Sequence, residues 1–415
     1  MKFQVFILSF LVAGITYAAP PADPELVDLW SHTDELNAAN RVPKAAAPRS
    51  LKRARSAPDL GLDDFLDANR NTGLLVLKGD TIVAERYQYG RTAQHRFASA
   101  SMAKTVLGML VGIAVHERKI ASIGDRAEKY VPALKGHPYG QTSIRDLLTM
   151  SSGVEWHEAY GWDRDQGLRL IENTFNGATS GGADTVLEFN HREAPAGTRF
   201  HYASGDSEVL GLVLRAAVGM PLAQYLSEKI WQPMGAEADA TWLVDRAGNE
   251  TGFCCINATL RDFGRFGLLL ANGGARDGKQ IIPAAWVKAA THPSALHLRV
   301  GFATLHNGYG YQTWILNDGR ARAGGQPIFA AFGVRGQAIY VDPASKVVVV
   351  HTAVWDENVD RDARVAQYQL WGRILKTLGD PAGRPRNGGD PVGAQFGASG
   401  ELWRTLLTKT SQKSL

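Results

Sequence analysis

The chain has 415 residues, of which 45% are hydrophobic, and this is ordinary for a globular protein with a large buried core. Its formal net charge is only +4. For a chain of this length, that balance lacks the strong positive charge expected of a nucleic-acid-binding protein, so we expect no nucleic-acid partner.

The first 18 residues have the pattern of a signal peptide. Lys2 supplies a positive charge, residues 3–15 form a mostly apolar run, and residues 16–18 form a cleavage site with small residues at its ends. The apolar run is too short for a membrane-spanning helix. A buried N-terminal helix is the alternative. We expect export to the periplasm or extracellular space of a bacterium, with no integral membrane segment after cleavage.

Residues 19–57 are expected to form a flexible basic arm. Such a charge run is usually solvated and mobile. The folded body is placed at residues 58–380, and residues 381–415, which begin with a stretch rich in Gly and Pro, are expected to form a loose extension. Six basic residues and no acidic one lie between positions 41 and 55, namely Arg41, Lys44, Arg49, Lys52, Arg53 and Arg55.

The body has strand patterns near both of its ends and helical patterns between them. The predicted fold class is therefore α+β, with an antiparallel sheet built from both chain ends, flanked by helices, and a helical region inserted between them. Alternation and turn residues predict strands at 73–78, 82–89, 337–341 and 346–354. Apolar residues at helical spacing predict helices at 102–115, 143–150, 207–218, 222–231, 260–270 and 361–378.

The two cysteines, Cys254 and Cys255, are neighbours. An exported protein can hold disulfides, but adjacent cysteines bridge only with an unusual peptide geometry. We favour two small buried apolar side chains, with a vicinal disulfide as the alternative. The sequence predicts no metal and no cofactor, because no Cys/His spacing is typical of zinc. Four histidines are interpreted as structural or surface residues: His157, His191, His201 and His351.

Ser101 and Lys104 carry the strongest chemical signal in the chain. Ser101 stands at the start of a helical pattern, and Lys104, three residues on, returns its side chain to the same face. A serine hydroxyl becomes a good nucleophile when a base takes its proton. A lysine can be that base if burial lowers the pKa of its amine. The Ser-x-x-Lys spacing alone is a weak signal, because it occurs by chance in many chains.

Two later segments could complete such a site. Tyr202, in a His-Tyr-Ala-Ser run, could exist partly as phenolate beside a lysine and relay a proton to a leaving group. In residues 331–337, Gly333 allows close approach of a backbone, and the Val334 N–H could face an oxyanion opposite the N–H of Ser101. A core tyrosine and a plain turn before a strand are the alternative interpretations.

Taken together, these motifs resemble the serine β-lactamase and penicillin-binding-protein superfamily, and within it the class C-type esterases and above all the 6-aminohexanoate-dimer hydrolases. The resemblance covers about residues 60–378. It implies a β-lactamase-like fold, an α/β sandwich plus a helical domain with the active site at their junction. The motifs are Ser-Met-Ala-Lys at 101–104, Leu-Leu-Thr-Met-Ser-Ser-Gly-Val at 147–154, Phe-His-Tyr-Ala-Ser at 200–204, Leu-Arg-Asp-Phe-Gly-Arg-Phe-Gly at 260–267 and Gly-Val-Arg-Gly-Gln at 333–337.

The resemblance also implies roles for individual residues. Ser101 would form an acyl-enzyme, Lys104 and Tyr202 would shuttle the proton with coupled titrations, and the main-chain N–H groups of Ser101 and Val334 would form the oxyanion hole. Tyr160 matches a tyrosine that closes over the amide substrate in the nylon-oligomer hydrolases. An ordinary loop aromatic is the alternative for Tyr160.

Two departures from the β-lactamase pattern bear on the substrate. Ser204 stands where β-lactamases of this type have an asparagine, and Ala331-Phe332-Gly333 stands where they have Lys-Thr-Gly. The missing lysine removes the usual anchor for a β-lactam carboxylate, although Arg335 could replace its charge. We therefore expect Ser204, Gly333 and Arg335 to contact substrate.

The sequence thus predicts a secreted serine hydrolase that cleaves a small-molecule ester or linear amide. A β-lactamase or DD-peptidase acting on cell-wall-type substrates is the second reading. A ligand-binding protein that keeps the fold without turnover is the third, and the intact Ser101, Lys104 and Tyr202 argue against it.

Overall fold

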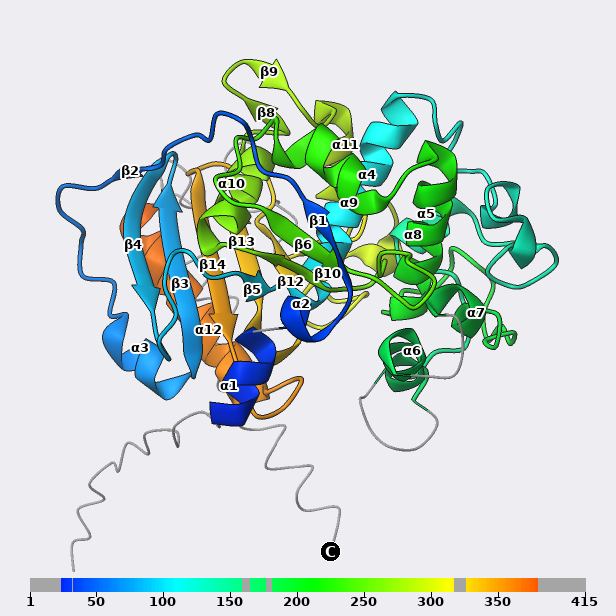
Figure 1. The fold of residues 1–415 in the computed structure, drawn as a ribbon, viewed down its shortest axis with the longest axis horizontal. Coiled ribbons are helices and arrows are strands. Elements are labelled where there is room, and N and C mark those ends of the chain that lie inside the picture. The colour runs from blue at the N-terminus through cyan, green and yellow to red at the C-terminus, as the bar shows by residue number, and fades with distance from the viewer. Residues whose placement is uncertain (1–23, 32, 159–164, 177–180, 317–325, 380–415) are drawn as a thin grey trace, which may run out of the picture.

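The computed structural model describes residues 24–31, 33–158, 165–176, 181–316 and 326–379. Its largest sheet has eight strands in the order β10-β11-β12-β13-β14-β3-β4-β2, and all neighbours are antiparallel except β2 with β4 (Figure 1). As predicted, its central strands come from both ends of the body. The strands are β2 (Lys52–Arg53), β3 (Asn71–Lys78), β4 (Thr81–Tyr87), β10 (Gly308–Tyr309), β11 (Trp314–Ile315), β12 (Phe329–Phe332), β13 (Ala338–Asp342) and β14 (Val347–Ala353).

Strand β3 shows why helices cover both faces of this sheet. Successive side chains of a strand point to opposite faces. Leu74 and Val76 belong to the core beneath α3 (Asp63–Ala68) and α12 (Arg361–Leu378), whereas Leu75 and Leu77 belong to the core beneath α10 (Leu260–Ala271). The unbroken apolar run of β3 is therefore that of a strand buried on both sides.

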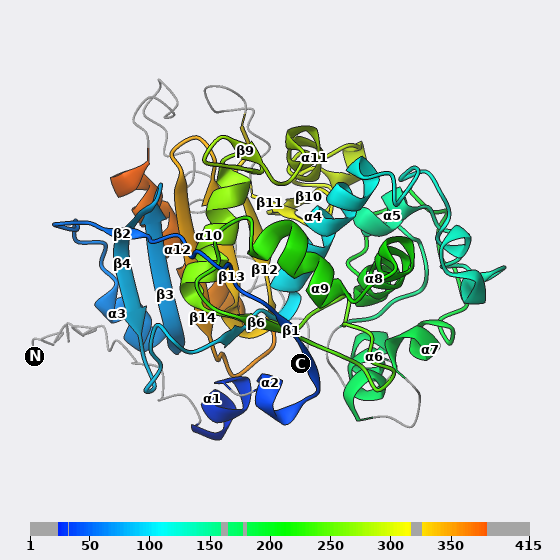
Figure 2. The same ribbon diagram turned by 45° about the horizontal axis from the view of Figure 1, so that its top comes forward.

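The inserted helical region lies to one side of the sheet, beyond β12 (Figures 1 and 2). Among the described residues, no single helix has both the length and the apolar composition to cross a membrane; α8 and the segment Leu222–Trp231, bent by 77°, pass that test only as a pair. The helices of the region are α4 (Ala103–His116), α5 (Ile144–Leu148), α6 (Gln166–Phe175), α7 (Gly182–Val186), α8 (Ser204–Val218), α9 (Leu222–Leu226) and α11 (Ala284–Ala290).

A smaller sheet of four strands joins the N-terminal segment to the body. Its order is β1-β6-β7-β5, and a separate hairpin pairs β8 with β9. The helices α1 and α2 precede it in the chain (Figure 2). The bounds are α1 (Pro24–Ser31), α2 (Thr33–Leu36), β1 (Ala39–Val42), β5 (Phe97–Ala98), β6 (Ala240–Leu243), β7 (Ile256–Ala258), β8 (Ala275–Arg276) and β9 (Lys279–Gln280).

The prediction of a flexible basic arm is wrong for the described part of residues 24–57. Strand β1 pairs with β6 and β2 pairs with β4, so this segment is built into both sheets. The count of charges between positions 41 and 55 did not reveal this packing, because the acidic partners lie far away in sequence. The ion pairs are Arg41 with Asp239, Arg49 with Asp277, and Arg53 with Glu85.

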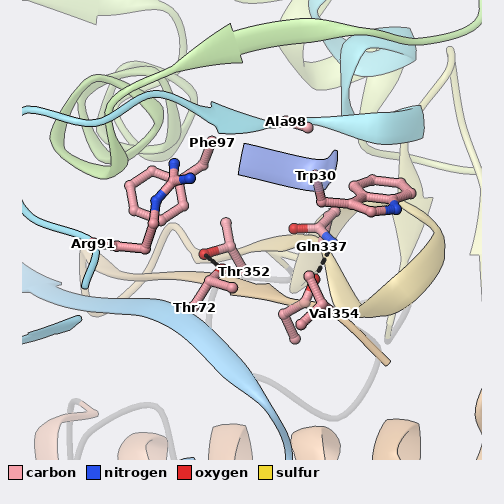
Figure 3. A pocket seen from close by; sticks show the side chains of 9 residues that line it. Trp30, Thr72, Arg91, Phe97, Ala98, Gln337, Thr352 and Val354 are labelled. Atoms are coloured by element: carbon pink, nitrogen blue, oxygen red, sulfur yellow. Dashed lines mark hydrogen bonds between the residues drawn. The ribbon is translucent and has the colours of Figure 1, made fainter. Parts of the chain in front are cut away.

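Helix α1 also contributes a wall to a small internal cavity (Figure 3). Trp30 lines it together with the buried Arg91, the hydrogen-bonded pair Thr72 and Thr352, and Gln337. The cavity volume is about 10 Å³, enough for one water molecule. The N-terminal segment is thus part of the packed interior. The predicted signal peptide at 1–18 and extension at 381–415 lie outside the described residues.

A buried ion pair within α10 orients Arg265, which in turn hydrogen-bonds to the N-terminal segment. Asp262 accepts hydrogen bonds from the main-chain N–H groups of Glu237 and Ala238, and it pairs with Arg265 at 2.9 Å. The Arg265 guanidinium also donates to the Arg49 carbonyl at 3.1 Å. Both partners are almost fully buried, with exposed fractions of 0% and 1%.

We predict that Asp262→Ala lowers the free energy of unfolding by about 3 kcal/mol, because it leaves two main-chain N–H groups without their acceptor and leaves the buried Arg265 guanidinium to pair with Glu237 in place of Asp262. Chemical denaturation followed by far-UV circular dichroism measures the change. Glu357→Ala removes an exposed carboxylate and should stay within about 0.5 kcal/mol of the parent. Equal effects of the two substitutions would contradict the buried pairing.

Candidate active site

Ser101 lies at the end of a tightly fixed turn that leads into α4. Ala100 adopts a φ of +44°, which is uncommon for a residue other than glycine. The Ser99 hydroxyl donates to the Ala100 carbonyl at 2.9 Å and accepts from the Ile256 N–H at 2.9 Å. These bonds tie the turn to β7, so the position of the Ser101 hydroxyl is set by packing as well as by the helix.

The Lys104 amine meets three oxygen acceptors. Its Nζ lies 2.9 Å from the Ser101 hydroxyl, 3.1 Å from the Ser204 hydroxyl and 2.9 Å from the Phe253 carbonyl. An ammonium group has three protons to donate, so these contacts satisfy all of them. The predicted juxtaposition of Ser101 and Lys104 is present.

Burial controls the charge of Lys104. The residue is only 2% exposed, and this burial lowers the pKa of the Lys104 amine to about 8, while the negative charges of Glu158 and Glu208 oppose the shift. Glu208 has a weak effect at neutral pH, because burial raises its own pKa to about 8. Near pH 8, Lys104 is therefore present in both the neutral form that can accept a proton and the charged form that can return it.

Tyr202 joins the pair from the residues that lead into α8. The Lys104 amine lies 4.9 Å from the centre of the Tyr202 ring, and the Ser101 side chain is close enough to the phenol to influence its pKa. The expectation of a partial phenolate is wrong: burial, followed by the charge of Glu158, raises the pKa of Tyr202 well above its usual value. At neutral pH Tyr202 is therefore a phenol and can act as a proton donor.

Aromatic residues fix the Tyr202 ring. Trp314 of β11 stacks on it with ring centroids 5.4 Å apart, and Tyr309 of β10 meets it edge-on at 6.4 Å. Tyr309 is 1% exposed, while Trp314 is half-buried. The segment of β10 and β11 therefore supports the proton donor from one edge of the main sheet.

Gly333 brings the end of β12 against the Ser101 turn. A Cβ atom at Gly333 would lie 2.7 Å from the Ser99 carbonyl oxygen and 2.8 Å from the Ala100 Cβ. Only glycine allows so close an approach. Gly333 thus acts through backbone packing, and it sets the Val334 main chain beside the nucleophile turn, where the sequence predicts the second oxyanion donor.

Ser204 connects the Lys104 amine to the carboxylate of Glu158. The Ser204 hydroxyl donates to one Glu158 carboxylate oxygen at 2.7 Å, and the Ser204 N–H donates to the other at 2.8 Å. Glu158 also accepts from the indole N–H of Trp156 at 2.8 Å. Ser204 was expected to contact substrate; here it links Lys104 to a carboxylate. Sequence reasoning missed Glu158, because it lies 54 residues from Lys104 in the chain and belongs to no spacing motif.

Two other predicted contacts stand apart from this cluster. The Arg335 guanidinium donates to the carbonyls of Trp355 at 2.6 Å and Asp356 at 3.0 Å, and it lies 5.9 Å from the Trp30 ring centre. The Arg335 guanidinium therefore contacts main-chain carbonyls and a tryptophan ring, and these contacts lie apart from Ser101 and Lys104. Tyr160 lies outside the described residues.

The two cysteines form a disulfide beside Lys104. The bond joins Cys254 to Cys255, so the favoured reading of two small buried apolar side chains is wrong and the alternative of a vicinal disulfide holds. Phe253, the residue before them, supplies the carbonyl that accepts from Lys104. Sequence reasoning could not find this acceptor, because any residue has a main-chain carbonyl.

Side chains that could bind a metal occur at the surface. Glu155, His157 and Glu193 place ligand atoms within 4.8 Å of one another. His191 contacts Glu155 at 3.0 Å, whereas His351 is fully buried and burial lowers its pKa to about 3. Exposed clusters of this kind are common without an ion. The three acceptors around the Lys104 amine are other residues, namely Ser101, Ser204 and Phe253.

Comparison with known proteins places this geometry in a family. Residues 63–370 match the Beta-lactamase family. The chain belongs to the β-lactamase family. It is accordingly a serine hydrolase with a β-lactamase-like fold, and the predicted resemblance and fold class are confirmed.

Relatives of this chain include proteins named as 6-aminohexanoate-dimer hydrolases. The chain is 26% identical over 317 residues to the 6-aminohexanoate-dimer hydrolase of Paenarthrobacter ureafaciens, covering 73% of this chain and 77% of that protein. A Bacillus anthracis structure described as a 6-aminohexanoate-dimer hydrolase superposes with a TM-score of 0.76 at 26% identity, over 86% of this chain and 96% of that one. A penicillin-binding protein from Bacillus halodurans shares the fold at 18% identity and a TM-score of 0.58, over 75% of this chain and all of that one.

We predict that Ser101→Ala abolishes acylation without unfolding the protein, and that Lys104→Ala and Tyr202→Phe each lower kcat by roughly 10²-fold or more. The loss follows from removing the nucleophile, the base or the proton donor. Steady-state kinetics together with thermal unfolding separate catalysis from folding. A Tyr202→Phe enzyme with unchanged kcat would remove Tyr202 from the proton transfer.

We predict that Glu158→Gln moves the rising limb of the pH–rate profile to lower pH. The Glu158 charge raises the pKa of Lys104, so its removal lowers that pKa and leaves more neutral amine at a given pH. The rate of fluorophosphonate labelling between pH 6 and 10 measures the shift. Glu155→Gln, which alters a partly exposed carboxylate in the same segment, is the control and should leave the profile in place.

Proposed function

We propose that this serine hydrolase cleaves esters or small linear amides through an acyl-enzyme on Ser101. The observation that carries the proposal is the contact of the buried Lys104 amine with the Ser101 hydroxyl at 2.9 Å, with the Tyr202 phenol beside both. This arrangement supplies a nucleophile, a base and a proton donor within one cluster.

The reaction follows from these groups. Neutral Lys104 takes the Ser101 proton while the hydroxyl oxygen attacks the carbonyl carbon of the substrate. Main-chain N–H groups of Ser101 and Val334 stabilise the oxyanion. Tyr202 gives its proton to the leaving alcohol or amine and is reprotonated from Lys104. Water then attacks the acyl-enzyme carbonyl carbon and loses a proton to neutral Lys104. The Ser101 oxygen leaves with a proton from Tyr202, which Lys104 replaces, and the carboxylic acid is released.

The environment of Arg335 favours this substrate class over β-lactams. The residues at 331–333 provide no cation, and Arg335 was the remaining candidate anchor for a substrate carboxylate. Its guanidinium is engaged by the carbonyls of Trp355 and Asp356. The relative from Paenarthrobacter ureafaciens is named for a linear amide dimer, which supports the same choice.

We also propose that the enzyme is exported. The leading 18 residues have the signal-peptide pattern, and a disulfide persists more readily in an oxidising compartment. N-terminal sequencing of protein recovered from the periplasm or medium should begin at Ala19, whereas retention of Met1 would refute cleavage.

The substrate class is tested with purified protein on p-nitrophenyl esters, 6-aminohexanoate dimer and a chromogenic cephalosporin. We expect turnover of short-chain esters or the amide dimer, with cephalosporin hydrolysis slower by roughly 10²-fold or more, since residues 331–333 supply no cation for its carboxylate and Arg335 is engaged by main-chain carbonyls. The Ser101→Ala enzyme is the control for each substrate. Cephalosporin turnover as fast as ester turnover would favour the β-lactamase alternative, and ligand binding without fluorophosphonate labelling would favour a non-catalytic protein.

A further inference from the structure

The peptide between Cys254 and Cys255 links the disulfide to the nucleophile turn. Its N–H, on Cys255, donates to the Ala100 carbonyl at 3.3 Å. Its carbonyl, on Cys254, accepts from the Trp242 indole at 3.1 Å and the Thr251 hydroxyl at 2.9 Å. The disulfide closes a ring that contains this peptide. The orientation of the peptide, and with it the bond to Ala100, therefore depends on the ring.

Two residues in uncommon backbone conformations face each other across that bond. Cys255 has a φ of +80° and Ala100 a φ of +44°. Residues with a Cβ atom adopt this region rarely and persist there only when their surroundings fix them. For Cys255 the disulfide ring restricts the rotation that would leave this region. Opening the ring frees Cys255 to return to a common conformation.

The same loop contacts the base. Phe253 precedes the disulfide and accepts a hydrogen bond from Lys104 through its carbonyl at 2.9 Å. A rearrangement at Cys254 and Cys255 would therefore reach Lys104 through Phe253 and Ser101 through Ala100. Cys255 is partly exposed and Cys254 is 8% exposed, so Cys255 is the more accessible residue of the pair.

We propose that Cys254 and Cys255 form a thiol–disulfide exchange site that holds the catalytic turn in its active geometry when oxidised and releases it when reduced. This rests on the proposed acylation of Ser101. A dithiol supplies two electrons: one thiolate attacks the Cys255 sulfur and expels the Cys254 thiolate, which takes a proton. The second thiol of the reductant then attacks the mixed disulfide, forming the oxidised reductant and releasing the Cys255 thiol.

The test compares the rate of fluorophosphonate labelling of oxidised full-length protein with that of protein reduced by dithiothreitol. Thiols are counted with Ellman's reagent and folding is followed by thermal unfolding. We expect two thiols after reduction and labelling slower by roughly tenfold or more, because small displacements of a base and nucleophile cost this much. Reoxidation should restore the rate.

Two double variants separate the backbone effect from loss of folding. The variant with Cys254→Ser and Cys255→Ser should be labelled slowly, at a rate that dithiothreitol does not change. Cys254→Ser with Cys255→Gly should regain most of the rate, because glycine adopts positive φ without a ring. Equal labelling of oxidised and reduced protein would overturn the redox proposal alone. So would two thiols in fully active, untreated protein. Absence of labelling in both states would overturn the proposed acylation as well.

Discussion

The buried amine of Lys104 is the constraint on which the site depends. A lysine that is 2% exposed must either lose its charge or find acceptors for its protons. Here it does both in part, because burial lowers its pKa to about 8 while three oxygens lie within 3.1 Å. Those oxygens belong to Ser101, Ser204 and Phe253, so three distant segments must meet at one atom.

Acidic groups around the Lys104 amine also influence its pKa. Glu158 bonds to Ser204 and raises the pKa of Lys104, so it limits how far burial can neutralise the base. Glu208 of α8 acts on the Lys104 amine in the same direction, and burial raises the pKa of Glu208 itself to about 8. The chemistry of the Ser-x-x-Lys pair is therefore set by residues outside that motif.

The residues of the candidate active site come from two parts of the fold. The turn before α4 presents Ser101 and α4 itself presents Lys104, while the residues that follow β12 of the main sheet present Gly333 and Val334. The loop with Cys254 and Cys255 lies against the turn between them. A hydrolytic site at such a junction can keep its acid–base core while the surrounding loops change the substrate it accepts.

The sequence by itself determined the central strands, the main helices and the pairing of Ser101 with Lys104, because these depend on local periodicity and on a three-residue spacing within one helix. Distant contacts decided the rest. The basic segment around Arg41 and Arg53 is part of the fold because its strands β1 and β2 pair with β6 and β4, which lie elsewhere in the chain. Glu158, the Phe253 carbonyl and the Cys254–Cys255 disulfide became part of the site only when the chain folded. No local pattern encodes which carboxylate, carbonyl or sulfur will be brought to a given amine, since that choice belongs to the packing of the whole core.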